Sequence, residues 1–188
     1  MGEDAKENIF QAASRLVAEG KDEGQITTRA IAAVAGVNSA LVNYYFQSKE
    51  NLLSCVVATM MGDIIKRFSK PDDKNADMVW RLKNMLTGTA EAAFRHRNIC
   101  KIAISQELKA GCRNSCIMVM PFLRGILPSR EDGDLVIIAL QLMLPFHYIV
   151  LYPELYGDYL GTDFFDRDRR EATIGRMVDC LLPGKGDA

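Results

Sequence analysis

The feature that most limits the possible folds of this chain is the helical spacing of its apolar residues, which continues along nearly its whole length. Apolar side chains recur three and four positions apart, as on one face of an α-helix, and no segment alternates in the manner of a β-strand. The expected helical segments are 9–20, 28–35, 39–45, 49–68, 78–97, 99–110, 114–126, 134–152 and 166–182. The sequence therefore predicts an all-α protein of about nine helices.

Composition narrows the class of protein further. The 188 residues are 48% apolar, which is enough for a sizeable core, and 23 basic against 24 acidic residues give a net charge of −1. This balance excludes a histone-like polycation and gives no overall electrostatic argument for nucleic acid or a membrane surface. Five cysteines are too few and odd in number for a disulfide framework, and the acidic start MGEDAKENIF does not resemble a signal peptide. We therefore expect a cytoplasmic protein.

One stretch, Leu135 to Tyr152, is almost wholly apolar and has about the minimum length that a bilayer requires. Gln141, Pro145 and His147 interrupt it. A helix buried in a core or in an oligomer interface explains these interruptions better than a membrane span does. We expect no membrane association.

The segment from 25 to 50 differs from the rest because its two helices are short. Thr27 is suited to cap the first helix, and Gly36 can end it in a left-handed turn. Asn38 can cap the second helix, and Ser48 the long helix that follows. Two short helices joined by a turn that contains glycine form a helix-turn-helix. Spacing alone leaves two ordinary core helices as the alternative.

The residues of this segment are more specific than its spacing. Residues 27–32 (TTRAIA), 35–38 (AGVN) and 43–50 (NYYFQSKE), followed by Leu52 and Leu53, resemble the N-terminal domain of the TetR (tetracycline-repressor-like) transcriptional regulators. The rest of the chain resembles the family only in length, helicity and its apolar last two helices. The resemblance implies a DNA-binding domain of three helices over residues 1–47, followed by an effector-binding and dimerisation domain over residues 48–188.

The resemblance also implies which residues meet DNA. Phosphates would be contacted from the start of the first short helix, from the end of the second, and from the start of the next helix: Thr28, Arg29, Tyr44, Tyr45 and Lys49. Base edges in the major groove would be met by the first turn of the recognition helix: Ser39, Ala40 and Leu41. Ser39 can bond a base edge, whereas Ala40 and Leu41 can meet only apolar groups such as a thymine methyl. Tyr45 equally fits a packing role.

Two departures from the family pattern concern the recognition helix. The usual tyrosine is Asn43 here, and its amide can bond either a phosphate or the N6/N7 edge of adenine. The helix also has no Arg or Lys, the side chains that most often bond guanine. We therefore expect an operator that is read partly through A·T pairs and partly through DNA shape.

A single short helix reads too few base pairs for good discrimination, so we expect a homodimer on a palindromic site. The interface is expected on the helices near 134–152 and 166–182, which pair with their mates in the resembling family. Its candidate residues are Leu140, Leu144, Ile174, Met177, Val178 and Leu181. Both helices equally fit the core of a monomer.

The helices after residue 48 would enclose a small-molecule effector that is largely apolar. Soft and aromatic side chains suit an adaptable pocket, and the candidates are Met60, Met85, Phe94, Met118, Phe122, Met143 and His147. Such residues also build ordinary cores, and His147 equally fits a core histidine with its hydrogen bonds satisfied. Basic residues around Arg95 and Arg97 leave open an anionic effector or an extra phosphate contact.

Cofactor and metal chemistry find little support in the sequence. Cys112 and Cys116 lie four positions apart, but zinc normally takes four ligands and the chain has only two histidines. We expect buried thiols and no metal, with a thiol switch as the alternative. The usual motifs of enzymes are absent, so we expect no enzyme.

The predicted function is DNA-binding transcriptional regulation, as a repressor that a small molecule releases. The alternative is a helical ligand-binding or protein-interaction module without DNA binding. Although the net charge is near zero, residues 24–49 contain Arg29 and Lys49 and no acid. The expected DNA-facing stretch is therefore locally positive.

Overall fold

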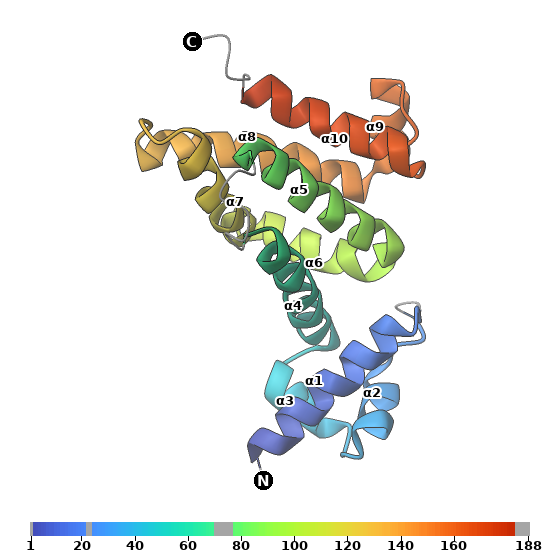
Figure 1. Ribbon diagram of the computed structural model, residues 1–188. Helices are drawn as coiled ribbons and strands as arrows, with labels where there is room; N and C mark the ends of the chain where they lie inside the picture. Colours follow the sequence, from blue (N-terminus) through green and yellow to red (C-terminus); the bar gives the residue numbers. More distant parts are fainter. Residues whose placement is uncertain (1, 22–23, 70–76, 183–188) are drawn as a thin grey trace. The chain divides into compact units, whose positions relative to one another are not determined.

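The computed structural model describes residues 2–21, 24–69 and 77–182, and these contain helices but no strand (Figure 1). The all-α prediction is confirmed. The described helices are α1 (Gly2–Ala18), α2 (Thr28–Ala35), α3 (Ala40–Phe46), α4 (Lys49–Ser69), α5 (Met78–Arg95), α6 (Arg97–Lys109), α7 (Arg113–Ile126), α8 (Asp132–Leu151), α9 (Pro153–Leu160) and α10 (Arg167–Leu181). The described helices include one, α9, that was not among the expected nine. It was missed because α8 ends at Leu151 and Pro153 starts the next helix almost at once.

The ends of α2 are set by the two residues that the sequence indicated. The Thr27 side chain accepts a hydrogen bond of 3.1 Å from the Ala30 backbone N–H. Gly36 follows the helix with φ at 67°, in the left-handed region. Backbone N–H groups of Gly36 and Val37 bond the carbonyls of Ala33 and Ala32, so the carbonyls at the end of α2 have partners.

Side chains likewise cap the two helices that follow. Asn38 Oδ1 accepts a hydrogen bond of 2.8 Å from the Ala40 N–H at the start of α3. Ser48 Oγ accepts one of 3.0 Å from the Asn51 N–H in the first turn of α4. Both capping predictions are confirmed. The sequence also predicts that Pro71 and Pro183 end helices, and both lie outside the described residues.

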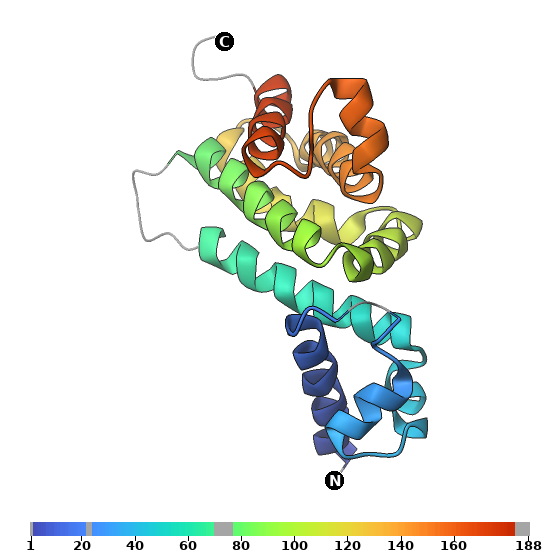
Figure 2. The same ribbon diagram turned by 90° about the vertical axis from the view of Figure 1, so that its right-hand side faces the viewer.

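The chain divides into two compact units, one made of residues 1–61 and 96–106 and the other of residues 62–95 and 107–188. In the first unit α1 contacts α2 and α3, and these helices lie together in both views (Figure 2). Aliphatic side chains from each of them fill the core: Ile9, Ala13, Leu16, Val17, Ile31 and Val42. A domain boundary after residue 47 remains a prediction.

The second unit is a helical bundle in which α5 and α8 are central. Helix α5 contacts α7, α8 and α10, and α8 also contacts α7, α9 and α10. By length and composition α8 is apolar enough to cross a membrane, with a mean hydropathy of 1.9, yet half of its apolar window is buried within the unit. A core helix has the same properties, and α8 fills this role here.

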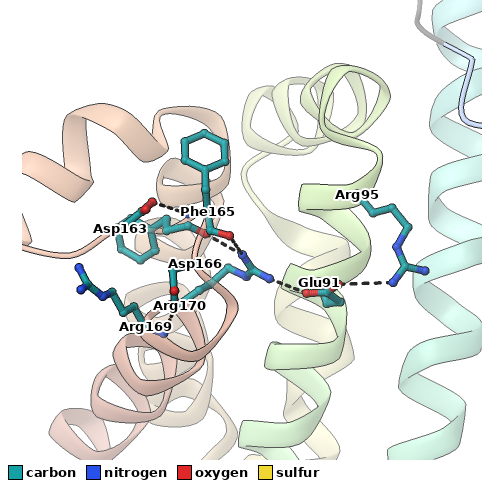
Figure 3. Close-up of polar contacts among 8 residues, drawn as sticks. Glu91, Arg95, Asp163, Phe165, Asp166, Arg169 and Arg170 are labelled. Carbon is teal, nitrogen blue, oxygen red and sulfur yellow. Dashed lines mark hydrogen bonds and ion pairs between the residues drawn. The ribbon is translucent and has the colours of Figure 1, made fainter.

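A buried arginine on α10 connects this helix to α5 and to the segment that precedes α10 (Figure 3). Arg170 is 5% exposed, and it pairs with Glu91 of α5. Its guanidinium also donates to the carbonyl oxygens of Phe164 at 2.7 Å and Phe165 at 3.3 Å, and lies 4.6 Å from the centre of the Phe94 ring. A guanidinium inside a protein needs several acceptors, and this one therefore ties the 162–166 segment to α5.

A second buried polar group is His147 of α8. Its Nδ1 lies 3.0 Å from the carbonyl oxygen of Met143, and its Nε2 lies 3.2 Å from Ser115 Oγ. Since a carbonyl can only accept, Nδ1 carries the proton and Nε2 accepts from the serine hydroxyl. Burial lowers the pKa of His147 to about 4, against the smaller opposing effect of the Glu107 charge. His147 is therefore a neutral core histidine.

We predict that His147 makes the protein less stable in acid. Between pH 6.5 and about 4 the unfolded chain binds a proton at this residue and the folded chain does not, so the free energy of unfolding should fall as the pH is lowered. The full effect is about 3 kcal/mol. The free energy of unfolding is measured with urea from pH 4 to pH 8. In the variant His147→Gln this free energy should fall less steeply as the pH is lowered. Equal slopes for the two proteins would contradict the prediction.

Candidate nucleic-acid interface and effector site

Helix α3 presents one uncharged face to solvent. Val42 is fully buried and fixes the inner side of the helix. Ala40, Asn43 and Tyr44 are exposed on the other side, with the Tyr44 side chain 76% accessible. Leu41 is partly buried, so the structure separates it from the more open positions of this helix.

The aromatic pair at the end of α3 has a defined geometry. The rings of Tyr44 and Tyr45 meet edge to face, with their centres 4.9 Å apart. Tyr45 is partly buried, which is consistent with packing as well as with contact through its hydroxyl. Tyr44 is held by this packing while its phenol remains open to solvent.

The remaining predicted DNA contacts belong to the same unit as α3. Thr28 and Arg29 form the start of α2, where Thr28 is partly buried and Arg29 exposed. Ser39 is partly buried just before α3. Lys49 starts α4, and its ammonium lies 3.9 Å from a carboxylate oxygen of Glu50, which offsets part of its charge.

The sequence did not indicate two residues near the end of α3, Lys6 and Gln47. The ammonium of Lys6, on α1, lies 5.9 Å from the centre of the Phe46 ring at the end of α3. No motif links these two positions, which are brought together only by the packing of α1 on α3. Gln47 is exposed after α3 with φ at 67°, and the sequence offers no signal for this backbone because glycine usually occupies it.

The predicted dimer residues divide between surface and core. On α8, Leu144 is exposed and Leu140 partly buried, whereas on α10 Met177 and Leu181 are partly buried. Ile174 and Val178 are 2% and 0% exposed within their own unit, so their burial does not support a partner contact, which stays a prediction. Their stripe belongs to the core because α10 packs on α5.

The structure places additional apolar side chains where a partner could reach them. On α8, Val136, Ile137 and Tyr148 are exposed alongside Leu144. The apolar surface continues through Tyr152 to α9, and it includes Leu155 and Tyr159. Because the Tyr148 and Tyr152 rings stack, with centres 6.2 Å apart, they form a joined apolar patch.

The predicted effector residues do not outline a single pocket. In the second unit Met85, Phe122, Met143 and His147 are buried, and Phe94 and Met118 partly buried. Met60 is partly buried in the first unit. Phe94 packs edge-on against Phe165 and also contacts Arg170. These contacts are those of a core, so an effector role for this set stays a prediction.

A cleft of about 510 Å³ lies elsewhere in the second unit. It is lined by residues of α9, by the 161–165 segment and by Arg169, and includes no predicted pocket residue. Glu154, Asp158 and Asp163 place carboxylates around it.

The two neighbouring thiols, Cys112 and Cys116, are both buried. Burial raises the pKa of Cys112 to about 12, and burial also raises the pKa of Cys116. Across the described ranges, no three His, Cys, Asp or Glu side chains converge in a way that could hold an ion.

Comparison with known proteins finds a family match for a segment of the first unit. Residues 9–56 match the family described as bacterial regulatory proteins, tetR family. Over 80 residues, 42% of the chain, the sequence is 40% identical to the HTH-type transcriptional dual regulator CecR of Shigella flexneri. That match spans only 34% of the length of CecR.

Solved structures extend the likeness of the fold to the whole chain. Thermus thermophilus FadR, a TetR family transcriptional repressor in complex with lauroyl-CoA, has a TM-score of 0.73 at 18% identity, over 97% of this chain and 96% of that one. A TetR transcriptional regulator from Rhodococcus sp. RHA1 has a TM-score of 0.70 at 15% identity, over 99% and 100%. FadR of Bacillus subtilis in complex with stearoyl-CoA has 0.59 at 17%, over 94% and 97%. The chain thus carries a helix-turn-helix segment of the tetR type and shares the fold of TetR family regulators.

Proposed function

We propose that the protein is a cytoplasmic, dimeric repressor that binds a palindromic operator and is released from it by a small molecule. The observation that carries this proposal is the exposed face of α3, which belongs to the segment matched by the TetR family. An uncharged, exposed helix in a helix-turn-helix is suited to the major groove.

Contacts with phosphates would orient this helix. The candidates are Arg29 at the start of α2, Lys49 at the start of α4 and the exposed Tyr44 on α3 itself. Lys6 adds an exposed cation near the end of α3. Three cations on each subunit give a modest attraction, so binding should depend on two subunits that act together.

The apolar patch on α8 and α9 is suited to hold those subunits together. Tyr148, Tyr152, Leu155 and Tyr159 present large apolar surfaces with hydroxyls on the tyrosines, and Leu144 lies one helical turn before Tyr148. In a two-fold dimer the same patch contributes from each subunit. We assign the interface to this patch rather than to the buried stripe of α10.

The second unit would bind the effector. Its core is rich in side chains that adapt to a ligand, among them Met85, Met118 and Met143. Two proteins of the same fold bind lauroyl-CoA and stearoyl-CoA. We therefore propose an effector with a long apolar chain, for which an acyl-CoA is the first probe.

The DNA-binding proposal predicts a steep dependence on salt. Six cations in a dimer give a slope of about −5 for the logarithm of the association constant against that of the salt concentration, or about a 1,000-fold loss from 50 to 200 mM. Tyr44→Phe removes a donor to phosphate and should weaken binding about 10-fold. Both are measured by fluorescence anisotropy on a duplex enriched from a random pool.

The matched control is Trp80→Phe, which removes an exposed N–H donor on α5, outside the DNA-facing residues and the dimer patch, and should leave DNA affinity unchanged. If no duplex is enriched at low salt, the protein is a helical ligand-binding or interaction module instead.

The dimer proposal predicts that a charge in the patch separates the subunits. Tyr148→Glu puts a carboxylate on the exposed side of α8, and sedimentation at micromolar concentration should change from dimer to folded monomer. Ile117→Glu introduces the same charge at an exposed apolar position on α7 and should remain dimeric. A dimeric Tyr148→Glu variant would place the interface elsewhere.

The effector proposal predicts that lauroyl-CoA lowers the affinity for the selected duplex. By linkage, the duplex must lower the affinity for lauroyl-CoA by the same factor, and calorimetry measures both. Coenzyme A without an acyl chain is the control and should have no effect. If binding of the duplex is unchanged by lauroyl-CoA, this acyl-CoA is excluded as the releasing ligand.

A further inference from the structure

We propose that α3 reads A·T base pairs directly, with the Ala40 methyl against a thymine methyl and the Asn43 amide on the adenine. This inference rests on the proposed DNA-binding function and specifies what its recognition helix selects. The structure adds two observations that the sequence could not give. It shows which residues of α3 share the outer face, and which of their side-chain groups are available to contact a base.

The outer face of α3 is defined by the position opposite Val42. Because Val42 is fully buried, residues two positions before it and one or two positions after it point away from the core. These are Ala40, Asn43 and Tyr44, and all three are exposed. Ala40 and Asn43 lie three positions apart, so their side chains are neighbours on this face.

Ala40 can offer only an apolar contact. Its backbone N–H is bonded to Asn38 Oδ1 at 2.8 Å, and its side chain is a methyl group. In the major groove the matching apolar group is the C5 methyl of thymine. Leu41, the other apolar candidate, is partly buried off this face and is therefore a weaker candidate.

Both the carbonyl and the NH2 group of the Asn43 side chain are available to contact a base. Within the described part of the chain, its side chain has no hydrogen-bond partner, although its backbone carbonyl accepts from the Gln47 N–H. An amide donates to N7 and accepts from N6 of adenine at the same time. Because Asn43 shares its face with Ala40, the assignment to adenine is more consistent than one to a phosphate.

Guanine has no matching group on this helix. Residues 39–48 contain no charged side chain, so the bidentate pairing of arginine or lysine with guanine is absent from this segment. The Tyr44 ring is held against Tyr45, and its hydroxyl is suited to a phosphate at the edge of the groove. The base edges are left to Ala40 and Asn43.

The first experiment selects duplexes from a random pool with the full-length protein at low salt. Both half-sites should be enriched in A·T pairs at the positions nearest α3. The thymines there are then replaced one at a time by uracil, which pairs identically but lacks the methyl. Each replacement at a contacted thymine should weaken binding about 4-fold, or about 15-fold for the two half-sites together.

The second experiment changes the selected base. Asn43→Arg should replace the enriched adenine by guanine in a repeated selection, because arginine bonds the O6 and N7 atoms of guanine. Asn8→Arg makes the same substitution at an exposed position on α1 and is the matched control, expected to keep the adenine. Circular dichroism checks that both variants fold.

The outcomes separate this inference from the function on which it rests. If no sequence is enriched, DNA binding itself fails. If sites are enriched with G·C pairs at the contacted positions, or if uracil binds as well as thymine, DNA binding stands and the A·T assignment is wrong.

Discussion

The left-handed backbone at Gly36 is the constraint on which the DNA-facing surface depends. With φ at 67°, this residue reverses the chain after α2 and brings the Val37 N–H to the Ala32 carbonyl at 3.0 Å. A residue with a Cβ would be strained there by about 1 to 2 kcal/mol, although no atom lies near enough to clash. The turn directs α3 so that Val42 enters the core. The outer face of α3 is thus a consequence of one backbone angle and one buried side chain.

Most of the helices were predictable because each has a local cause. Apolar spacing located them, and the Thr27 and Ser48 side chains, whose capping hydrogen bonds are observed, marked two of the starts. Helix α9 was not predictable by spacing, since it is a short helix that Pro153 begins almost directly after α8. Spacing also revealed the apolar stripe of α10 but not what covers it. Ile174 therefore was assigned to a partner subunit, although it is buried in the second unit, where α10 packs on α5.

The candidate DNA-binding site was predictable where it is continuous in sequence. Residues from Thr28 to Lys49 form a local motif, whereas Lys6 joins this region only through the packing of α1. An effector site has no such motif, because a pocket is a space left between segments that are distant in sequence. The methionines and phenylalanines of the second unit are equally good core residues, and the packing of Phe94 on Phe165 illustrates this. His147 was ambiguous for the same reason until its partners, Met143 and Ser115, were known.

An uncharged recognition face has a consequence for how a repressor of this kind would be switched. A thymine methyl and an adenine contact discriminate by only about 1 to 3 kcal/mol for each half-site, and phosphate contacts add no sequence information. In a dimer the free energies of the two half-sites add, and the corresponding gains in affinity therefore multiply. An effector then need not disturb either recognition helix. A change in the separation of the two recognition helices removes the recognition free energy of one half-site. The ligand must then bind the altered dimer more tightly than the DNA-bound one by only this small free energy.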